Sequence, residues 1–209
     1  MALAPTPTLP AIGVEPLKLP RTLRLSPEQF ELVCQANPDA VLELAADGQL
    51  IAMTPTGSET GARNSDLIYQ LQSYARHSRR WKVFDSSTGF RLPDGSVLSP
   101  DASLVRLERW QALIPQQRQG FAPLCPDLVV ELASPSDEGP RGVSALRQKM
   151  ELYRANGAQL GWLLLPDQQA VEIWRSDLTE PEHIEPAIRL DGGKQFPGLM
   201  IDLAEIWAG

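Results

Sequence analysis

Glu131 is the most informative residue of the chain, because it lies inside the apolar run DLVVEL. A run of this kind predicts a strand that is buried on both faces. Side chains alternate along a strand, so Leu128 and Val130 face one way and Glu131 the other. A buried carboxylate costs several kcal/mol unless it is paired, protonated or bound to a metal. Glu131 is therefore either a functional acid or one that pairs with an arginine or reaches water near the strand end.

Asp101 follows Pro100 and opens another apolar segment. By itself a Pro-Asp pair is typical of a solvated turn. Two carboxylates on neighbouring strands, however, are the kind of oxygen ligands that a hard cation such as Mg²⁺ requires. Taken with Glu131, Asp101 becomes a candidate metal ligand.

Lys149 is expected on the inner face of a helix over residues 145–156. Leu146, Met150 and Tyr153 share that face by helical spacing. Lys149 could simply send its ammonium group out to solvent along apolar surface. Alternatively, the ammonium could meet the two carboxylates and stabilise negative charge developing on a phosphate.

The elements that must position these residues follow from apolar periodicity and turn signals. Ser26, Pro27 and Gln29 form a helix start with a capping box, and Asn37-Pro38 ends that helix. Two apolar runs around Asp47-Gly48 predict a β-hairpin. Longer helices are expected at 58–78 and 145–156, strands at 81–85, 89–92, 101–105, 127–132, 160–165 and 171–174, and a packed amphipathic end at 203–207.

This order indicates an α/β fold in which helices cover a sheet, without regular βαβ alternation. Residues 1–24 are rich in proline and predict an extended or disordered tail, which leaves residues 25–209 as one domain. No apolar run is long enough to span a bilayer and no basic leader precedes one, so we expect a cytoplasmic protein without a membrane partner. The two cysteines suggest neither a disulfide framework nor a zinc knuckle.

The motifs together resemble the PD-(D/E)XK nuclease superfamily and, within it, the Uma-two family of restriction endonucleases. The matching stretches are VLELAADGQLIAMTP, SPDASLV, CPDLVVELASPSD, KMELYRANG, LGWLLLP and VEIW, spread from about residue 25 to residue 207. The resemblance implies a restriction-endonuclease-like mixed β-sheet flanked by helices, with an N-terminal helix and a β-hairpin.

The same resemblance assigns roles to individual residues. It implies that Asp101 and Glu131 hold the metal, that Lys149 is the catalytic lysine and that Glu43 of the hairpin is a further acidic site residue. An edge-strand glutamate in water is an equally good interpretation of Glu43. Two positions depart from the pattern: Ala133 stands where the superfamily lysine is expected, and Thr60 where many family members carry a histidine.

The function indicated is hydrolysis of phosphodiester bonds, most simply in DNA, by an endonuclease that depends on Mg²⁺, with Mn²⁺ as a substitute. The alternative is a catalytically silent nucleic-acid-binding or regulatory module on the same fold. RNA remains open as the substrate, and a homodimer is one way to cut two strands. The formal charge of −7 excludes a broad basic face, so nucleic-acid contacts are expected at local arginines. These are Arg63, Arg76, Arg79, Arg80, Arg141, Arg147 and Arg154.

Overall fold

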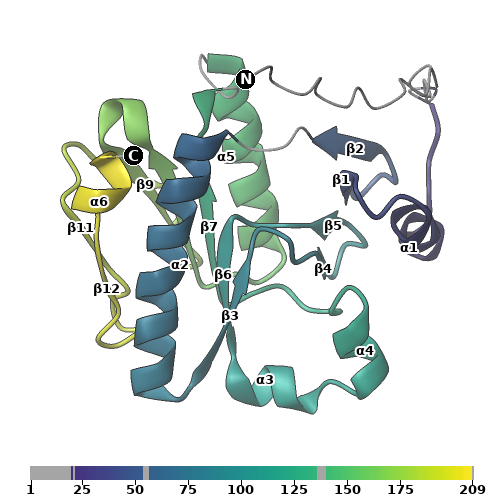
Figure 1. The fold of residues 1–209 in the computed structure, drawn as a ribbon, viewed down its shortest axis with the longest axis horizontal. Helices are drawn as coiled ribbons and strands as arrows, with labels where there is room; N and C mark the ends of the chain where they lie inside the picture. The colour runs from purple at the N-terminus through teal and green to yellow at the C-terminus, as the bar shows by residue number, and fades with distance from the viewer. Residues whose placement is uncertain (1–19, 21, 54–56, 136–139, 209) are drawn as a thin grey trace, which may run out of the picture.

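A computed structural model describes residues 20, 22–53, 57–135 and 140–208, and Figure 1 shows their arrangement. Its centre is a six-stranded sheet with the strand order β10-β9-β8-β7-β6-β3. Only the β7 and β8 pair is parallel, so the sheet is mixed, as expected. The strands are β3 (Trp81–Asp85), β6 (Ala102–Arg106), β7 (Leu128–Leu132), β8 (Leu160–Leu165), β9 (Ala170–Arg175) and β10 (Glu182–Ile184).

Two long helices cover the opposite faces of this sheet. Helix α2 (Ser58–Ser78) packs Leu67 and Leu71 against the face that carries Leu128 and Val130. Helix α5 (Pro140–Ala155) lies in the connection from β7 to β8, because two parallel strands must be joined by a crossover. It packs Met150 on the other face of the sheet. Each buried strand therefore alternates its side chains between two apolar cores.

A second sheet lies beside the first and has the order β2-β1-β5-β4 (Figure 1). The predicted hairpin forms its larger part, with β1 (Val41–Leu44) antiparallel to β2 (Leu50–Met53). Its other strands are β4 (Phe90–Arg91) and β5 (Val97–Leu98). Helix α1 (Pro27–Ala36) begins with the predicted capping box, in which Ser26 and Gln29 exchange bonds of 3.2 and 2.9 Å. The N-terminal helix and the hairpin are thus confirmed.

The sequence patterns missed several short elements. Strands β11 (Arg189–Asp191) and β12 (Met200–Asp202) pair with each other and bring α6 (Ala204–Ala208) against α2. Helices α3 (Leu107–Ala112) and α4 (Pro115–Gln119) follow β6, and a 3-10 turn, η2 (Pro166–Gln168), joins β8 to β9. Strands of three residues and helices of three to six residues are too short for periodicity to reveal. Helix α5 also begins at Pro140, five residues before the expected start, because a proline can occupy the first turn of a helix.

The predicted tail falls almost entirely outside the described residues, of which it contributes only residues 20 and 22–24. Leu25 attaches the start of the described chain to the turn of the β1–β2 hairpin, because its amide donates a 2.8 Å hydrogen bond to the Gly48 carbonyl. None of the helices in the described ranges has the length and apolar character needed to cross a membrane.

A candidate acidic site at the junction of the two sheets

Glu131 lies near the end of β7, on the face that α5 covers. Its side chain is only 4% exposed, and its carboxylate Oε1 accepts a 3.1 Å hydrogen bond from the Tyr153 hydroxyl of α5. Strand β7 is an inner strand, paired with β6 on one side and with β8 on the other, so Glu131 does not lie on an edge of the sheet. The predicted burial of Glu131 is therefore what the structure shows, and its polar contacts compensate part of the cost.

Lys149 points inward from α5, with its side chain 12% exposed. Its Nζ lies 2.8 Å from Glu43 Oε1, 3.0 Å from Glu131 Oε1 and 3.0 Å from the Ser99 carbonyl. An ammonium group has three N–H donors, and three oxygens surround this one. The side chain accordingly does not reach out to solvent, and it joins the two sheets.

Glu43 comes from β1 and is also buried, with 4% of its surface exposed. Its Oε1 accepts a 2.7 Å bond from the Ser99 amide in addition to the Lys149 contact. Ser99 lies in the segment that connects β5 to β6, two residues before Asp101. Glu43 therefore fixes both the lysine and the chain that leads into Asp101, which a glutamate in water could not do.

Asp101 immediately precedes β6 and is half-buried. The register pairs Ala102 with Val130, so one further step along the two antiparallel strands brings Asp101 opposite Glu131. Residues paired in this way share one face of the sheet. Asp101 Oδ2 accepts a 2.8 Å bond from the Leu132 amide, which holds the carboxylate at the end of β7.

The charges of this cluster shift the pKa values of its members. Burial raises the pKa of Glu131 to about 8, and the negative charges of Asp101 and Glu43 add to the rise, against the effect of Lys149. Burial disfavours the charged form of Lys149, but Glu131 and Glu43 outweigh it and raise the pKa of the ammonium above its ordinary value. Burial and the neighbouring carboxylates also raise the pKa of Tyr153 well above its ordinary range. Lys149 is therefore a permanent cation, and Tyr153 stays a neutral hydrogen-bond donor.

The donor set suits a hard divalent ion in its chemistry. The carboxylates of Glu43 and Glu131 face one ammonium group, and that of Asp101 is close enough to Glu131 to influence its charge; all three offer oxygen ligands. As the side chains stand, no three His, Cys, Asp or Glu residues within the described ranges are arranged to hold a metal ion. The ammonium of Lys149 bridges Glu43 and Glu131, where it balances part of their charge.

Two contributors to the cluster had no signal as site residues in the sequence. Tyr153 fits the apolar stripe of α5, so its hydroxyl contact with Glu131 depends on packing alone. Ser99 contributes only backbone atoms, which carry no residue signature. Ala133, two residues after Glu131, has no group that could replace Lys149, and the buried hydroxyl of Thr60 has no partner among the described residues.

Comparison with known proteins places this chain in a family. The model of the Uma2 family, described as "putative restriction endonuclease", matches residues 27–204. The chain belongs to the Uma2 family. The match runs from α1 into α6, so it includes all four predicted site residues. No curated protein matches the chain.

A solved structure from Anabaena variabilis, described as "a putative nuclease belonging to DUF820", is similar to this chain with a TM-score of 0.69. The two share 20% sequence identity over 88% of this chain and 98% of the other. At this level of identity the likeness concerns the fold. It confirms the predicted fold class, a mixed sheet flanked by helices.

Proposed function

We propose that this protein is a Mg²⁺-dependent endonuclease that hydrolyses phosphodiester bonds, with DNA as the polymer. The observation that carries the proposal is the ammonium of Lys149, held at 2.8 and 3.0 Å by Glu43 and Glu131 at the end of the sheet where Asp101 lies. Membership of a restriction-endonuclease family supports the same reaction class. A fold alone would not, because one fold carries many activities.

Asp101 and Glu131 are the residues that would hold Mg²⁺, or Mn²⁺ in its place, with Glu43 as a third candidate ligand. When bound, the ion would supply positive charge to the phosphodiester and make a nearby water easier to deprotonate. Lys149 and Tyr153 both contact Oε1 of Glu131. Glu43 also uses Oε1 for its contacts with Lys149 and Ser99. The second oxygen of each glutamate is thus the one that these contacts leave for a ligand.

Lys149 would act through its charge. Because its pKa is raised, the ammonium keeps its proton at neutral pH and cannot serve as a general base. Its three oxygen partners hold it in place before substrate arrives, and a fixed cation of this kind stabilises negative charge that develops on a phosphate oxygen. Glu43 positions this cation from the neighbouring sheet.

A nicking assay on supercoiled plasmid tests the proposal directly. We expect cleavage with Mg²⁺ or Mn²⁺, no cleavage in EDTA, and no cleavage by the Asp101→Asn variant. A parallel assay on labelled RNA asks whether RNA is the substrate instead. Cutting both strands calls for two sites, so we also propose a homodimer, which a strictly monomeric mass in light scattering would exclude.

One observation favours a second candidate, a nucleic-acid-binding module without cleavage. Across the described residues, the acidic side chains are not yet arranged as a metal cage. Calorimetric titration with Mg²⁺ separates the two candidates. Saturable binding that Asp101→Asn abolishes supports the nuclease, and absence of binding supports the silent module.

A further inference from the structure

A basic hollow of about 760 Å³ lies at the other end of the six-stranded sheet from the acidic site. It forms where the C-terminal end of α2, the start of β3, the end of β6 and the β11–β12 connection meet, at the lower end of Figure 1. We define the basic hollow by six of its lining residues. They are Arg79, Arg80, Trp81, Arg106, Gln159 and Lys194. Its volume is in the range of pockets that hold a small ligand or one unit of a polymer.

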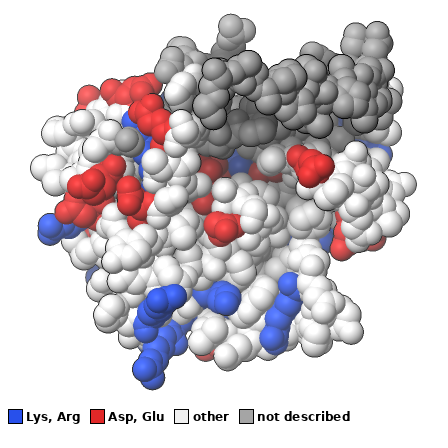
Figure 2. Space-filling model, viewed as in Figure 1, with Lys and Arg blue, Asp and Glu red and all other residues white. Residues whose placement is uncertain are grey.

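The charge of the basic hollow is opposite to that of the whole chain. Four cations line it against one carboxylate, that of Glu108, in a protein whose formal charge is −7. Arg79, Arg80 and Lys194 form no ion pair within the described part of the chain. Arg106 is paired with the exposed Glu108, whose Oε1 lies 3.7 Å from its Nε. Figure 2 shows Lys and Arg gathered at this lower end, over the end of α2, while acidic side chains lie higher on the same face. Positive charge around a hollow concentrates the field there and attracts anions.

The position of the cations is not explained by the dipole of α2 alone. That helix ends at Ser78 with Arg79 as its C-cap residue, and cations near a helix C-terminus stabilise it. Arg79 itself has a φ of 55°, a left-handed conformation that glycine adopts more easily. Arg106 and Lys194, however, come from other elements and owe nothing to this dipole.

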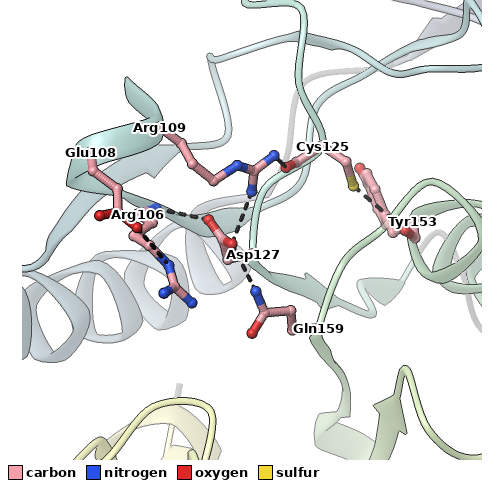
Figure 3. A network of polar contacts seen from close by, with 7 residues as sticks. All are labelled: Arg106, Glu108, Arg109, Cys125, Asp127, Tyr153 and Gln159. Carbon is pink, nitrogen blue, oxygen red and sulfur yellow. Dashed lines mark hydrogen bonds and ion pairs between the residues drawn. The ribbon is translucent and has the colours of Figure 1, made fainter. Parts of the chain in front are cut away.

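A buried network fixes one wall of the basic hollow (Figure 3). Asp127, 1% exposed, accepts bonds from the Arg106 amide at 2.8 Å and from Gln159 Nε2 at 3.0 Å. Its Oδ1 also lies 2.9 Å from Arg109. Arg109 balances the charge of Asp127, so this acid orients the wall without cancelling the positive charge of the hollow. The guanidinium of Arg106 lies over the Trp81 ring, 5.4 Å from its centroid.

The structure also separates the arginines that were expected to contact nucleic acid. Arg63, Arg147 and Arg154 are in ion pairs with Glu59, Glu172 and Glu151, so the expectation that they are available for contacts is not supported. The side chain of Arg141 lies outside the described residues. The other three, Arg76, Arg79 and Arg80, lie at the end of α2. Arg79 and Arg80 line the basic hollow, where the fold brings Arg106 and Lys194 beside them.

We propose that the basic hollow binds a phosphate group of a nucleic-acid strand, at a site separate from the acidic cluster. Guanidinium groups match the geometry of phosphate oxygens, and Gln159 adds a neutral amide. Along β6 the two sites are about 17 Å apart, from five residues at roughly 3.3 Å each. Arg106 shares the α2 face with Ala102, whereas Asp101 shares the α5 face with Glu131.

Separating the acidic site from the basic hollow would help the protein to bind a negatively charged strand. Without a metal ion the acidic site repels a polyanion, so an acidic protein needs a separate positive anchor for its substrate. The choice of nucleic acid as the ligand rests on the proposed function, while the affinity for phosphate follows from the basic hollow alone.

The test compares the full-length protein with the double variant Arg80→Gln/Lys194→Gln. Neither residue belongs to the acidic site, and both are exposed and outside any ion pair in the described chain. Binding of a fluorescein-labelled 12-nucleotide DNA strand and of its duplex is followed by anisotropy in EDTA over a series of salt concentrations. We expect the variant to bind at least tenfold more weakly and its salt slope to fall by about one to two, near 0.7–0.9 per lost phosphate contact.

The control variant Arg24→Gln/Arg154→Gln removes two positive charges from ion pairs elsewhere. It should bind almost as the wild type does, and equal losses in both variants would overturn the proposal. Unchanged oligonucleotide binding by Arg80→Gln/Lys194→Gln would also overturn it. If Arg80→Gln/Lys194→Gln weakens the binding of inorganic phosphate or of a nucleoside monophosphate but not that of the oligonucleotide, the basic hollow serves a small phosphorylated molecule instead.

The same variants distinguish a failure of the phosphate anchor from a failure of the proposed nuclease activity. The double variant should retain the full thermal stabilisation by Mg²⁺, because Asp101 and Glu131 are intact. A wild type that binds the oligonucleotide through the basic hollow but neither binds Mg²⁺ nor cleaves would refute the nuclease and leave the anchor standing.

Discussion

Glu43 of β1 and Lys149 of α5 meet at 2.8 Å, although β1 belongs to the smaller sheet, α5 covers the six-stranded one, and the two residues lie 106 positions apart in the sequence. This contact joins the hairpin to the helix that covers the main sheet. It also places a positive charge beside Glu131, so the junction of the two sheets and the candidate site are the same place.

Replacing Lys149 with methionine keeps most of the apolar stem and removes the charge. We expect cleavage to fall about 100-fold, since a preorganised charge of this kind contributes about 3 kcal/mol to the transition state. In EDTA the variant should lose about 3 kcal/mol of stability, because Glu43 and Glu131 lose their buried partner. Mg²⁺ should then raise its melting temperature more than it raises that of the wild type. Normal nicking by Lys149→Met would refute the assignment.

Replacing Asp101 with asparagine removes one oxygen charge and leaves an acceptor for the Leu132 amide. The fold should survive, while the thermal response to Mg²⁺ and the plasmid nicking both disappear. Asp177→Asn, an exposed change outside the site, is the matched control and should behave as the wild type does. Persistent Mg²⁺ stabilisation in Asp101→Asn would show that this residue is not a ligand.

Replacing Glu131 with glutamine should stabilise the metal-free protein at alkaline pH. The folded pKa of about 8 exceeds the ordinary value of 4.5, so the folded state binds more protons between these limits. The contribution of Glu131 to stability therefore falls as pH rises from about 4.5 to 8. In EDTA at pH 8.5 the variant should melt at least about 2 °C above the wild type, with the gap closing toward pH 4. Equal melting temperatures at every pH would contradict this linkage.

Glu43 can be tested as a positioning residue with two substitutions. Glu43→Gln retains an oxygen that can accept bonds from Ser99 and Lys149, whereas Glu43→Ala retains none. We expect kcat to fall roughly tenfold more in the alanine variant, from the loss of about 1.4 kcal/mol of positioning, with KM little changed. If both variants lose Mg²⁺ binding completely, Glu43 is a metal ligand rather than a positioning residue.

Deletion of residues 1–20 tests the predicted tail. A proline-rich segment of this composition is expected to bury little surface, so the shortened chain should melt within a few degrees of the full chain and cleave equally well. A larger loss in differential scanning calorimetry would show that the segment is docked on the domain.

Much of the site could be predicted because single residues broke local patterns. Glu131 stands out in an apolar strand, and Lys149 stands out in an apolar helix face; both contrasts arise from the periodicity of one element. The pairing of these two with Glu43 could not be derived in this way. It depends on how the hairpin sheet is docked beside the main sheet, and the docking surface has no repeating pattern in the sequence.

The basic hollow likewise depends on contacts between distant segments, which local sequence patterns do not predict. Arg79 and Arg80 form a visible cluster in the sequence, but Arg106 and Lys194 are 26 and 114 residues further along from Arg80. Lys194 follows β11, a three-residue strand with no detectable alternation. Short elements with long-range partners are where local physical patterns carry the least information.

The junction of the two sheets also bears on the order in which the protein folds. Lys149 contacts Glu43 across 106 residues and Ser99 across 50, and each of these long chain loops must close before the contacts can form. We therefore expect the junction to form after the transition state of folding, once the strands of the main sheet have paired. Substitutions there should accelerate unfolding and leave the refolding rate nearly unchanged. The candidate site would then be the first part of the domain to be lost whenever the native state begins to open.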